Sequence, residues 1–380
     1  MKHTPVNGAP VPIFAKKYDR VAVIGAGSWG TALAAILASS GVQVNLWGRR
    51  TYVVDEINTS QCNNSYLPDV PLPVSLRAFA DLDAALENVQ AALIVVPSRS
   101  IRAVARRMSS SIPNAIPVAV CAKGIEENSG LLMTQVAEEE LPGHPVGCVS
   151  GPTFAREAAL GHPTAATVAF PFAYADRLKP AESFAAQLAV SLTTESFRAY
   201  VSDDLVGVEI GGALKNVIAI ACGMMTGAGF AENTRAALIT RGVDEMKALA
   251  EALGGRRETV TGLSGIGDLS LTCSSSTSRN MSLGLQLGQG TARKDCFDGA
   301  PVVVEGEANA KSVTDLARTV GVALPICETV RAILHDDQDL GTAFAALWAR
   351  PIEAEPRTMD LEFSHPATDQ AIATLAERIS

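Results

Sequence analysis

The sequence has little positive charge relative to its negative charge. Its 380 residues include 31 Lys and Arg but 40 Asp and Glu, which gives a net charge of −9 at pH 7. A surface with this balance repels polyanions, so the composition argues against nucleic acid or an anionic membrane as a bulk partner. Any binding site for an anion must therefore be a local basic pocket.

The chain also lacks the cysteine and histidine patterns of bridges and metal sites. The cysteines are odd in number and form no C-x-x-C pair: Cys62, Cys121, Cys148, Cys222, Cys273, Cys296 and Cys327. The histidines stand far apart, without metal-ligand spacing: His3, His144, His162, His335 and His365. We therefore expect no disulfide framework and no metal, and free thiols fit a reducing cytoplasm.

Long apolar segments are missing as well. No apolar run approaches the length of a membrane span, and residues 1–19 lack the apolar core of a signal peptide. With 47% hydrophobic and 19% charged residues the composition is that of a globular protein, and 380 residues suffice for two domains. We expect a cytoplasmic protein with no integral membrane segment, beginning with a loosely ordered lead-in at residues 1–18.

The most informative feature that is present is a glycine turn. Residues 21–30 read V-A-V-I-G-A-G-S-W-G, an apolar strand followed by Gly25, Gly27 and Gly30. In a dinucleotide-binding turn the first glycine permits the tight turn, the second lets a pyrophosphate reach the backbone, and the third lets helix and strand pack closely. A helix expected at residues 31–39 would point its N–H groups at the phosphate. The alternative is a purely structural turn in an unrelated α/β protein.

The end of the next expected strand, residues 42–47, indicates which dinucleotide is bound. An NAD-preferring site has a carboxylate there for the ribose hydroxyls, but this chain has Gly48, Arg49 and Arg50. Guanidinium groups suit a ribose 2'-phosphate, which they can hold bidentately. We predict NADP as the preferred cofactor and NAD as a second one. The alternative is a solvated basic pair on a loop.

Strand patterns continue through the first half of the chain. Apolar runs at residues 93–96, 117–121 and 146–149 end in polar residues, which places Lys123 and the turn at 150–154 at the carboxyl edge of a parallel sheet, near the cofactor. Residues 164–169 and a strand near 191–194 would extend this sheet.

From residue 201 the pattern becomes helical. Apolar residues recur at helical spacing over residues 205–225, 234–253, 281–287 and 308–320. The sequence therefore predicts an α/β N-terminal Rossmann-type domain with a mostly parallel sheet at residues 19–200, followed by an all-α C-terminal domain at residues 201–380.

The second half contains an unusual lysine. Lys215 lies in the apolar segment G-G-A-L-K-N-V-I-A-I-A, where it either extends to solvent or faces a crevice. In a crevice, desolvation would lower its pKa toward the range useful for proton transfer. The neighbouring Gly211 and Gly212 favour a ligand-facing surface.

A hydroxyl-rich loop follows further on. It begins after the single carboxylate Asp268 and ends at Ser278, Arg279 and Asn280, just before a helix expected to begin near Met281. An arginine, an amide and helix N–H groups together would form a phosphate cradle. The alternatives are a solvated loop arginine and, for Asp268, an N-cap of the next segment.

Taken together, these segments resemble the NAD(P)-dependent glycerol-3-phosphate dehydrogenase family, in its bacterial type. The resemblance runs from residue 21 to about 326, and its motifs stand in the family's order: G-A-G-S-W-G-T-A-L-A, L-W-G-R, A-K-G-I-E, S-G-P-T-F-A-R-E, G-G-A-L-K-N-V-I-A-I, N-T-R-A-A-L-I-T-R-G, G-D-L-x-L-T-C, S-R-N and V-V-E-G. The departures are the lead-in, the residues after V-V-E-G (Glu307, Ala308, Asn309) and the tail beyond about Leu347.

The resemblance implies reversible hydride transfer between NAD(P)H and dihydroxyacetone phosphate, giving sn-glycerol 3-phosphate for phospholipid synthesis. Lys215 matches the catalytic lysine that donates the proton, Asp268 would position it, and Lys123 matches a position contacting cofactor and substrate. The implied substrate pocket adds Gly151, Thr153, Ser278, Arg279 and Asn280. The implied cofactor contacts, besides the glycines and Lys123, are Ser28, Trp29, Arg49, Ala155, Arg279, Val303 and Glu305. A homodimer is a default expectation for such enzymes.

Two other functions are compatible with a dinucleotide-binding turn. A related two-domain reductase of another small keto or hydroxy acid would share the glycine turn and a helical lysine, but would have no need of the loop at 278–280. A non-catalytic dinucleotide sensor would need neither Lys215 nor Asp268.

Overall fold

One mixed sheet organises residues 20–202. The computed structural model describes residues 14–355, 359 and 361–379, and in this part of the chain the sheet has the strand order β3-β2-β1-β4-β5-β6-β7-β8. All neighbouring strands are parallel except β6 and β7, which are antiparallel. The strands are β1 (Arg20–Ile24), β2 (Gln43–Trp47), β3 (Leu76–Phe79), β4 (Ala91–Ile94), β5 (Val118–Val120), β6 (Val146–Ser150), β7 (Thr164–Ala169) and β8 (Phe197–Ser202).

Helices cover both faces of this sheet, which explains why its central strands are apolar throughout. One face packs against α1 (Ser28–Ser39) and α8 (Phe184–Leu192), and the other packs against α3 (Leu82–Leu86), α4 (Ile101–Met108) and α5 (Met133–Glu140). The other helices of this part of the chain are α2 (Thr51–Ser60), η1 (Ser98–Ser100), α6 (Ala155–Ala159), α7 (Tyr174–Leu178) and η2 (Pro180–Glu182). The predicted α/β domain with a mostly parallel sheet is confirmed.

One predicted strand is wrong. Residues 191–194 do not form a strand, because Ser191 and Leu192 end the helix α8. Ser183 caps that helix by accepting a hydrogen bond from the backbone of Ala186, and the Ser191 hydroxyl donates to the carbonyl of Gln187, one turn earlier. The last strand of this sheet is β8, which begins at Phe197.

Most of the predicted lead-in, residues 1–13, lies outside the described residues. Its last residue is tied to the sheet domain: Tyr18 is buried, and its backbone N–H donates to the Ser191 hydroxyl at 3.0 Å.

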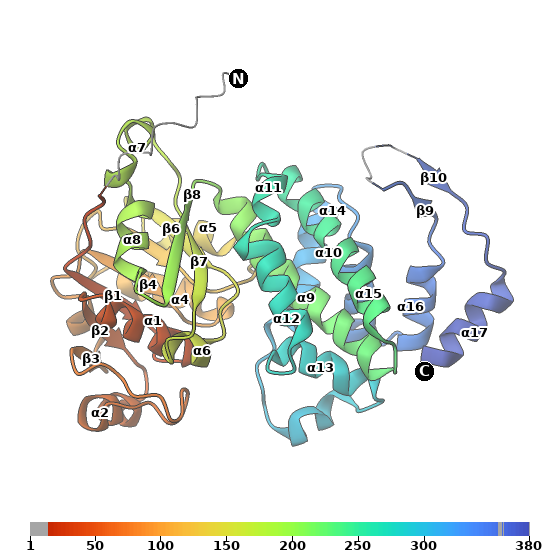
Figure 1. Cartoon of the computed structure of the whole chain (residues 1–380), viewed down its shortest axis with the longest axis horizontal. Helices are drawn as coiled ribbons and strands as arrows, with labels where there is room; N and C mark the ends of the chain where they lie inside the picture. The colour runs from red at the N-terminus through yellow and green to blue at the C-terminus, as the bar shows by residue number, and fades with distance from the viewer. Residues whose placement is uncertain (1–13, 356–358, 360, 380) are drawn as a thin grey trace.

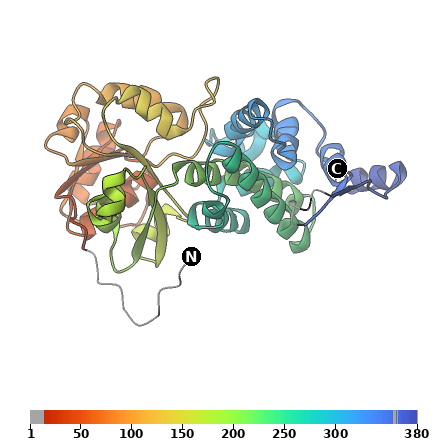
Figure 2. The same ribbon diagram turned by 90° about the horizontal axis from the view of Figure 1, so that it is seen from above.

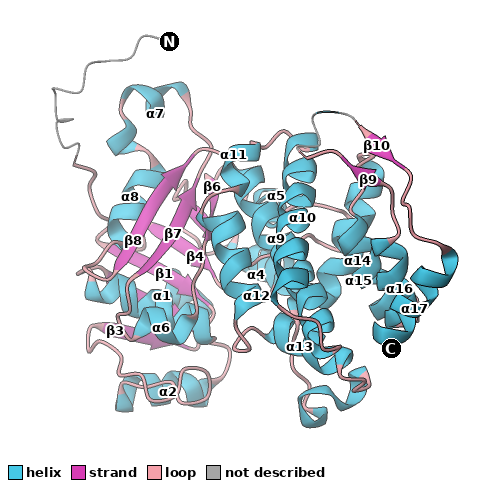
Figure 3. Cartoon of the chain, turned by 45° about the vertical axis from the view of Figure 1, so that its right-hand side comes forward, coloured by secondary structure: helices cyan, strands magenta, loops and turns pink. Residues whose placement is uncertain are grey.

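The described residues after Ser202 are mainly helical (Figure 3). α9 (Leu205–Gly227) runs through their centre and packs against α10 (Glu232–Ala252), α12 (Asp268–Ser274), α13 (Arg279–Gly288), α14 (Glu305–Thr319) and α15 (Pro325–His335). The remaining elements are α11 (Arg257–Val260), the π-helical turn η3 (Leu263–Gly267), η4 (Arg293–Gly299), α16 (Leu340–Trp348), the short hairpin β9 (Ile352–Glu353) and β10 (Glu362–Phe363), and α17 (Asp369–Ile379).

The expectation that no apolar run is long enough to span a membrane is wrong for α9. This helix has 23 residues and a mean hydropathy of 1.6 in its most apolar window. However, 89% of that window is buried inside the protein, because the surrounding helices cover α9. Its apolar composition is therefore that of a core helix.

The sheet and the helical part lie side by side, and within the described residues the chain passes from one to the other where β8 leads into α9 (Figures 1 and 2). We propose the division into domains at this crossing, at about residue 200. Glu209 of α9 joins the two parts: its carboxylate accepts hydrogen bonds from the backbone and hydroxyl of Thr134, at 3.0 and 2.5 Å, at the start of α5. Burial raises the pKa of Glu209 to about 7.

Candidate active site

The three glycines of the turn differ in what surrounds them. Gly25 has a φ of +127°, and a Cβ there would lie 2.4 Å from the carbonyl oxygen of Val95. A Cβ on Gly30 would lie 1.8 Å from the carbonyl oxygen of Gly25, whereas a Cβ on Gly27 would meet nothing within 4 Å. Gly25 and Gly30 are thus required by the turn and its packing. Gly27 borders open space at the start of α1, where a pyrophosphate fits.

Beside Gly27 lies a cavity of about 310 Å³ at the carboxyl edge of the sheet. Arg49 and Arg50 both line it, so they are not simply a basic pair on a remote loop. Arg99 of η1 lines the same cavity, and the sequence did not single it out. The residues present therefore fit an anionic dinucleotide.

The other residues expected at the cofactor gather around the start of α1. The Ser28 hydroxyl donates to the carbonyl of Tyr66 at 2.6 Å. Trp29 and Ala155 pack against one small apolar cluster of Ala32, Leu67 and Val70. At this cluster α6 packs against α1, so Trp29 and Ala155, which are 126 positions apart in the chain, contact the same apolar residues.

Lys215 is buried and does not extend to solvent. Only 8% of Lys215 is exposed, and its Nζ donates to Asp268 Oδ1 at 2.7 Å and to the Thr272 hydroxyl at 2.9 Å. From the sheet domain, Lys123 donates to Asp268 Oδ2 at 2.5 Å and to the carbonyl of Gly151 at 3.2 Å. Two lysines from different parts of the chain therefore share one buried carboxylate.

These contacts set the protonation of the group. Burial lowers the pKa of Lys215 to about 8, although the charge of Asp268 opposes this change. Burial alone would raise the pKa of Asp268, but the charges of Lys123 and Lys215 outweigh it, so its pKa lies below the ordinary value. The site thus holds an ionised carboxylate and a lysine that can exchange a proton near neutral pH.

The local fold explains how Asp268 reaches Lys215. The π-helical turn η3 leads directly into α12, whose first residue is Asp268. A Cβ on Gly211 would lie 2.9 Å from the backbone of Gly265, so this glycine lets η3 pack against α9. Asp268 is not an N-cap: that position belongs to Gly267, and the Asp268 carboxylate binds the lysines instead.

The prediction that Gly211 and Gly212 mark a ligand-facing surface needs correction. Gly211 faces the backbone of η3, and Gly212 faces the side chains of Lys123 and Ser150. Their small size serves close packing within the protein. In the case of Gly212, this packing holds Lys123 against α9.

The loop at residues 278–280 forms the start of α13, two residues earlier than expected. The Ser278 hydroxyl caps this helix by accepting from the backbone of Met281 at 3.3 Å. The Asn280 amide is bound within the protein: it donates to the Asn216 side chain and accepts from the backbone of Gly306, both at 2.9 Å. Arg279 is exposed.

The remaining predicted residues lie around these groups. The carbonyl of Gly151 accepts from the hydroxyl of Thr153 as well as from Lys123. Glu305 begins α14 and is half-buried, and this burial raises its pKa against the opposing charges of Arg279, Lys123 and Lys215. Val303, just before α14, is 39% exposed.

Two further residues of the site escaped the sequence reasoning. Thr272 lies one helical turn after Asp268, and this i, i+4 spacing is a signal that would have placed both on one helix face. Asn309 is buried on α14, and its amide donates to the carbonyls of Lys123 and Ala213, each at 3.4 Å. Nothing in the sequence around Asn309 indicates these contacts.

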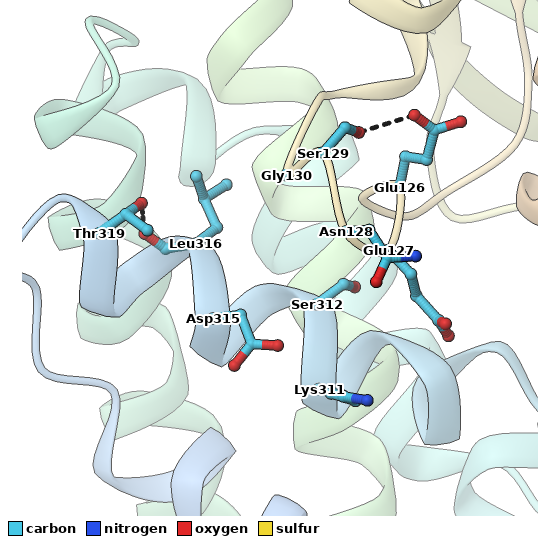
Figure 4. Close-up of a pocket in the computed structure, with 10 residues that line it drawn as sticks. All are labelled: Glu126, Glu127, Asn128, Ser129, Gly130, Lys311, Ser312, Asp315, Leu316 and Thr319. Atoms are coloured by element: carbon cyan, nitrogen blue, oxygen red, sulfur yellow. Dashed lines mark hydrogen bonds between the residues drawn. The ribbon is translucent and has the colours of Figure 1, made fainter.

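A second cavity, of about 180 Å³, is lined by a loop that follows Lys123 in the chain and by α14 (Figure 4). Its walls are the loop Glu126–Gly130 and the middle of α14, including Ser312. The hydroxyl of Ser129 donates to Glu126, which keeps this loop folded back on itself. Because its lining comes from this loop and from α14, the cavity lies between the sheet domain and the helical domain.

The chain matches two family models. The model of the NAD-dependent glycerol-3-phosphate dehydrogenase N-terminus matches residues 20–174. The model of the NAD-dependent glycerol-3-phosphate dehydrogenase C-terminus matches residues 204–345. The chain belongs to the NAD-dependent glycerol-3-phosphate dehydrogenase family. The resemblance inferred from the motifs is thus confirmed.

Individual relatives agree with this assignment. The glycerol-3-phosphate dehydrogenase (NAD(P)+) of Rhodospirillum rubrum is 44% identical over 337 residues, covering 89% of this chain and 94% of that protein. The enzyme of the same name from Maricaulis maris is 45% identical over 342 residues, covering 89% and 99%. The crystal structure of glycerol-3-phosphate dehydrogenase from Coxiella burnetii is similar with a TM-score of 0.80 at 40% identity, covering 88% and 99%.

More distant structures share the fold alone. A ketopantoate reductase of Ralstonia eutropha has a TM-score of 0.53 at 17% identity, and D-mandelate dehydrogenase has a TM-score of 0.56 at 16% identity. The likeness to these reductases of other small acids is much weaker than the family match. It therefore gives no support to the alternative of a different keto-acid substrate.

Proposed function

We propose that this protein reduces dihydroxyacetone phosphate reversibly to sn-glycerol 3-phosphate, with NADPH preferred and NADH as a second cofactor, for phospholipid synthesis. The observation that carries the proposal is the buried group of Lys215, Asp268 and Lys123. A bound nicotinamide would supply the hydride for the ketone carbon. The protein must then supply a proton and stabilise the negative charge that develops on the ketone oxygen.

Lys215 is the proton donor in this proposal. In its charged form its Nζ, oriented by Asp268 Oδ1 and the Thr272 hydroxyl, would donate to the developing alkoxide, and in the reverse reaction the neutral amine would accept the proton. Lys123, anchored on Asp268 Oδ2 and the carbonyl of Gly151, adds a second positive charge near the same oxygen.

The substrate phosphate would lie at the start of α13. Arg279 is exposed there and free to turn toward a ligand, and the first N–H groups of the helix favour an anion. Ser278 and Asn280 belong to this cradle mainly as its framework, because their side chains already bind Met281, Asn216 and Gly306. Gly151 and Thr153 complete the pocket from the sheet side.

The cofactor would lie along the carboxyl edge of the sheet, with its pyrophosphate at Gly27 and its adenosine in the cavity lined by Arg49 and Arg50. Lys123, Ala155, Arg279, Val303 and Glu305 would border the nicotinamide half. We further propose that the protein is cytoplasmic and that it acts as a homodimer, because two-fold homodimers are the commonest protein oligomers.

The test is a spectrophotometric assay of dihydroxyacetone phosphate reduction with NADPH and with NADH. We expect saturable oxidation of both, with a higher kcat/KM for NADPH. The same assay with 2-keto acids in place of the ketone phosphate should give no comparable rate. A kcat/KM for any keto acid that exceeds the value for dihydroxyacetone phosphate would overturn the proposal.

A further inference from the structure

We propose that Arg99 is a cofactor-selecting residue, which with Arg49 clamps the ribose 2'-phosphate of NADP while Arg50 instead supports the adenine. This inference rests on the proposed use of NADP. It assigns different roles to the three arginines of one cavity, and one of the three lies outside the sequence segment from which the preference was predicted.

The position of Arg99 is set by the sheet topology. β2 and β4 flank β1 on opposite sides, and Arg49 follows β2 whereas Arg99 follows β4. Both nevertheless line the one cavity beside Gly27, together with Trp47. Arg49 and Arg99 thus border one site for the adenosine, from loops that follow two different strands.

The charges around the cavity are of one sign. Its lining residues include Arg49, Arg50 and Arg99 and no Asp or Glu. In a protein with a net charge of −9, such a local excess of cations points to an anionic ligand group. The pyrophosphate itself is served by the start of α1, so the arginines are available for a further phosphate.

The three arginines differ in what holds them. Arg50 donates to the Tyr52 hydroxyl at 3.0 Å, and its guanidinium lies over the Tyr66 ring at 5.6 Å. These contacts fix the plane of its guanidinium, which then offers a flat face to a purine ring. In the described part of the chain Arg49 and Arg99 have no such hydrogen bond, ion pair or ring contact. They remain free to form paired N–H···O bonds with a phosphate.

The test compares ligands that differ in one phosphate. Isothermal titration calorimetry would measure the Kd of adenosine 2',5'-bisphosphate and of adenosine 5'-diphosphate for wild type, Arg99→Gln, Arg50→Gln and the control Arg77→Gln, an exposed arginine on β3 outside the cavity lining. For Arg99→Gln we expect about tenfold or greater weakening for the 2',5'-bisphosphate and less than twofold for the diphosphate. Added salt should shrink the difference.

The other variants complete the pattern. Arg50→Gln should weaken both ligands by a similar factor, because both contain adenine, and Arg77→Gln should weaken neither. Equal weakening of both ligands by Arg99→Gln, or no weakening of either, would overturn the assignment. All variants replace exposed side chains, and thermal unfolding would verify that they fold as wild type does.

The outcome for Arg99 is separable from the outcome for the enzyme. If wild type fails to reduce dihydroxyacetone phosphate but Arg99→Gln selectively loses the 2',5'-bisphosphate, the proposed function fails and the cofactor assignment stands. If wild type reduces the substrate and Arg99→Gln leaves the NADPH to NADH ratio of kcat/KM unchanged, the proposed function stands and the cofactor assignment of Arg99 fails.

Discussion

Lys215 and Asp268 are joined by a hydrogen bond of 2.7 Å between α9 and α12, and both side chains are buried. A carboxylate that is 1% exposed keeps its charge only because cations face it, and here Lys123 on the sheet domain supplies the second one. The proton donor, the group that orients it and the contact between domains are thus one cluster.

Replacement of the proton donor should separate chemistry from cofactor binding. For Lys215→Ala we expect kcat to fall by about 10²- to 10⁴-fold, the usual contribution of a positioned general acid, with the Kd for NADPH within about threefold of wild type. Lys294→Ala, at an exposed lysine of η4, serves as the control. Near-normal turnover in a folded Lys215→Ala protein would refute the proton-donor role.

The reaction should depend on pH in opposite senses in its two directions. Because the pKa of Lys215 lies at about 8, ketone reduction, which needs the charged amine, should slow as the pH rises through 8, and oxidation should accelerate. Asp268 raises the pKa of Lys215 by its charge, so Asp268→Asn should move both profiles to lower pH. The measurement is kcat/KM between pH 6 and 10 in each direction. Profiles of Asp268→Asn that coincide with those of wild type would contradict the coupling.

Arg279 and Asn280 are neighbours with different expected phenotypes. Arg279→Ala should raise KM for dihydroxyacetone phosphate by about tenfold or more, because the phosphate provides binding energy remote from the ketone, and it should leave stability unchanged. Asn280→Ala removes a bridge between Asn216 and Gly306, so it should lower the free energy of unfolding by about 1–3 kcal/mol. Steady-state kinetics and urea unfolding distinguish the two, and an unaltered KM for Arg279→Ala would exclude the cradle.

Two alanine substitutions in the glycine turn should fail for different reasons. Gly27→Ala fits the fold, since its Cβ meets nothing within 4 Å, but the methyl group would occupy the pyrophosphate position; we expect at least about tenfold weaker NADPH binding and a loss of at most about 1 kcal/mol in stability. Gly30→Ala would force a Cβ to 1.8 Å from the carbonyl of Gly25, and should lower stability by about 3 kcal/mol or more. Equal stability of the two proteins would contradict this reading of the turn.

Local patterns predicted the features that depend on neighbours in sequence. The glycine turn, the strand at Thr164–Ala169 and the helix around Lys215 were all visible, because turn geometry and hydrophobic periodicity are short-range properties. The strand expected at 191–194 is wrong because a short run of apolar and small residues suits a helix end as well as a strand. Only the cap at Ser183 and the packing of α8 on the sheet decide between the two.

The sequence by itself determined the family, the dinucleotide turn and the identity of the lysine and carboxylate, since each is carried by residues in a fixed order along the chain. Only the tertiary structure decided that Lys123 and Lys215 share Asp268, that Asn309 holds the backbone of Lys123, and that Arg99 joins Arg49 in one cavity. These pairs lie between 50 and 186 residues apart, and no local propensity encodes such contacts. They arise because parallel strands bring their carboxyl ends to one edge, and because α9 packs against that edge.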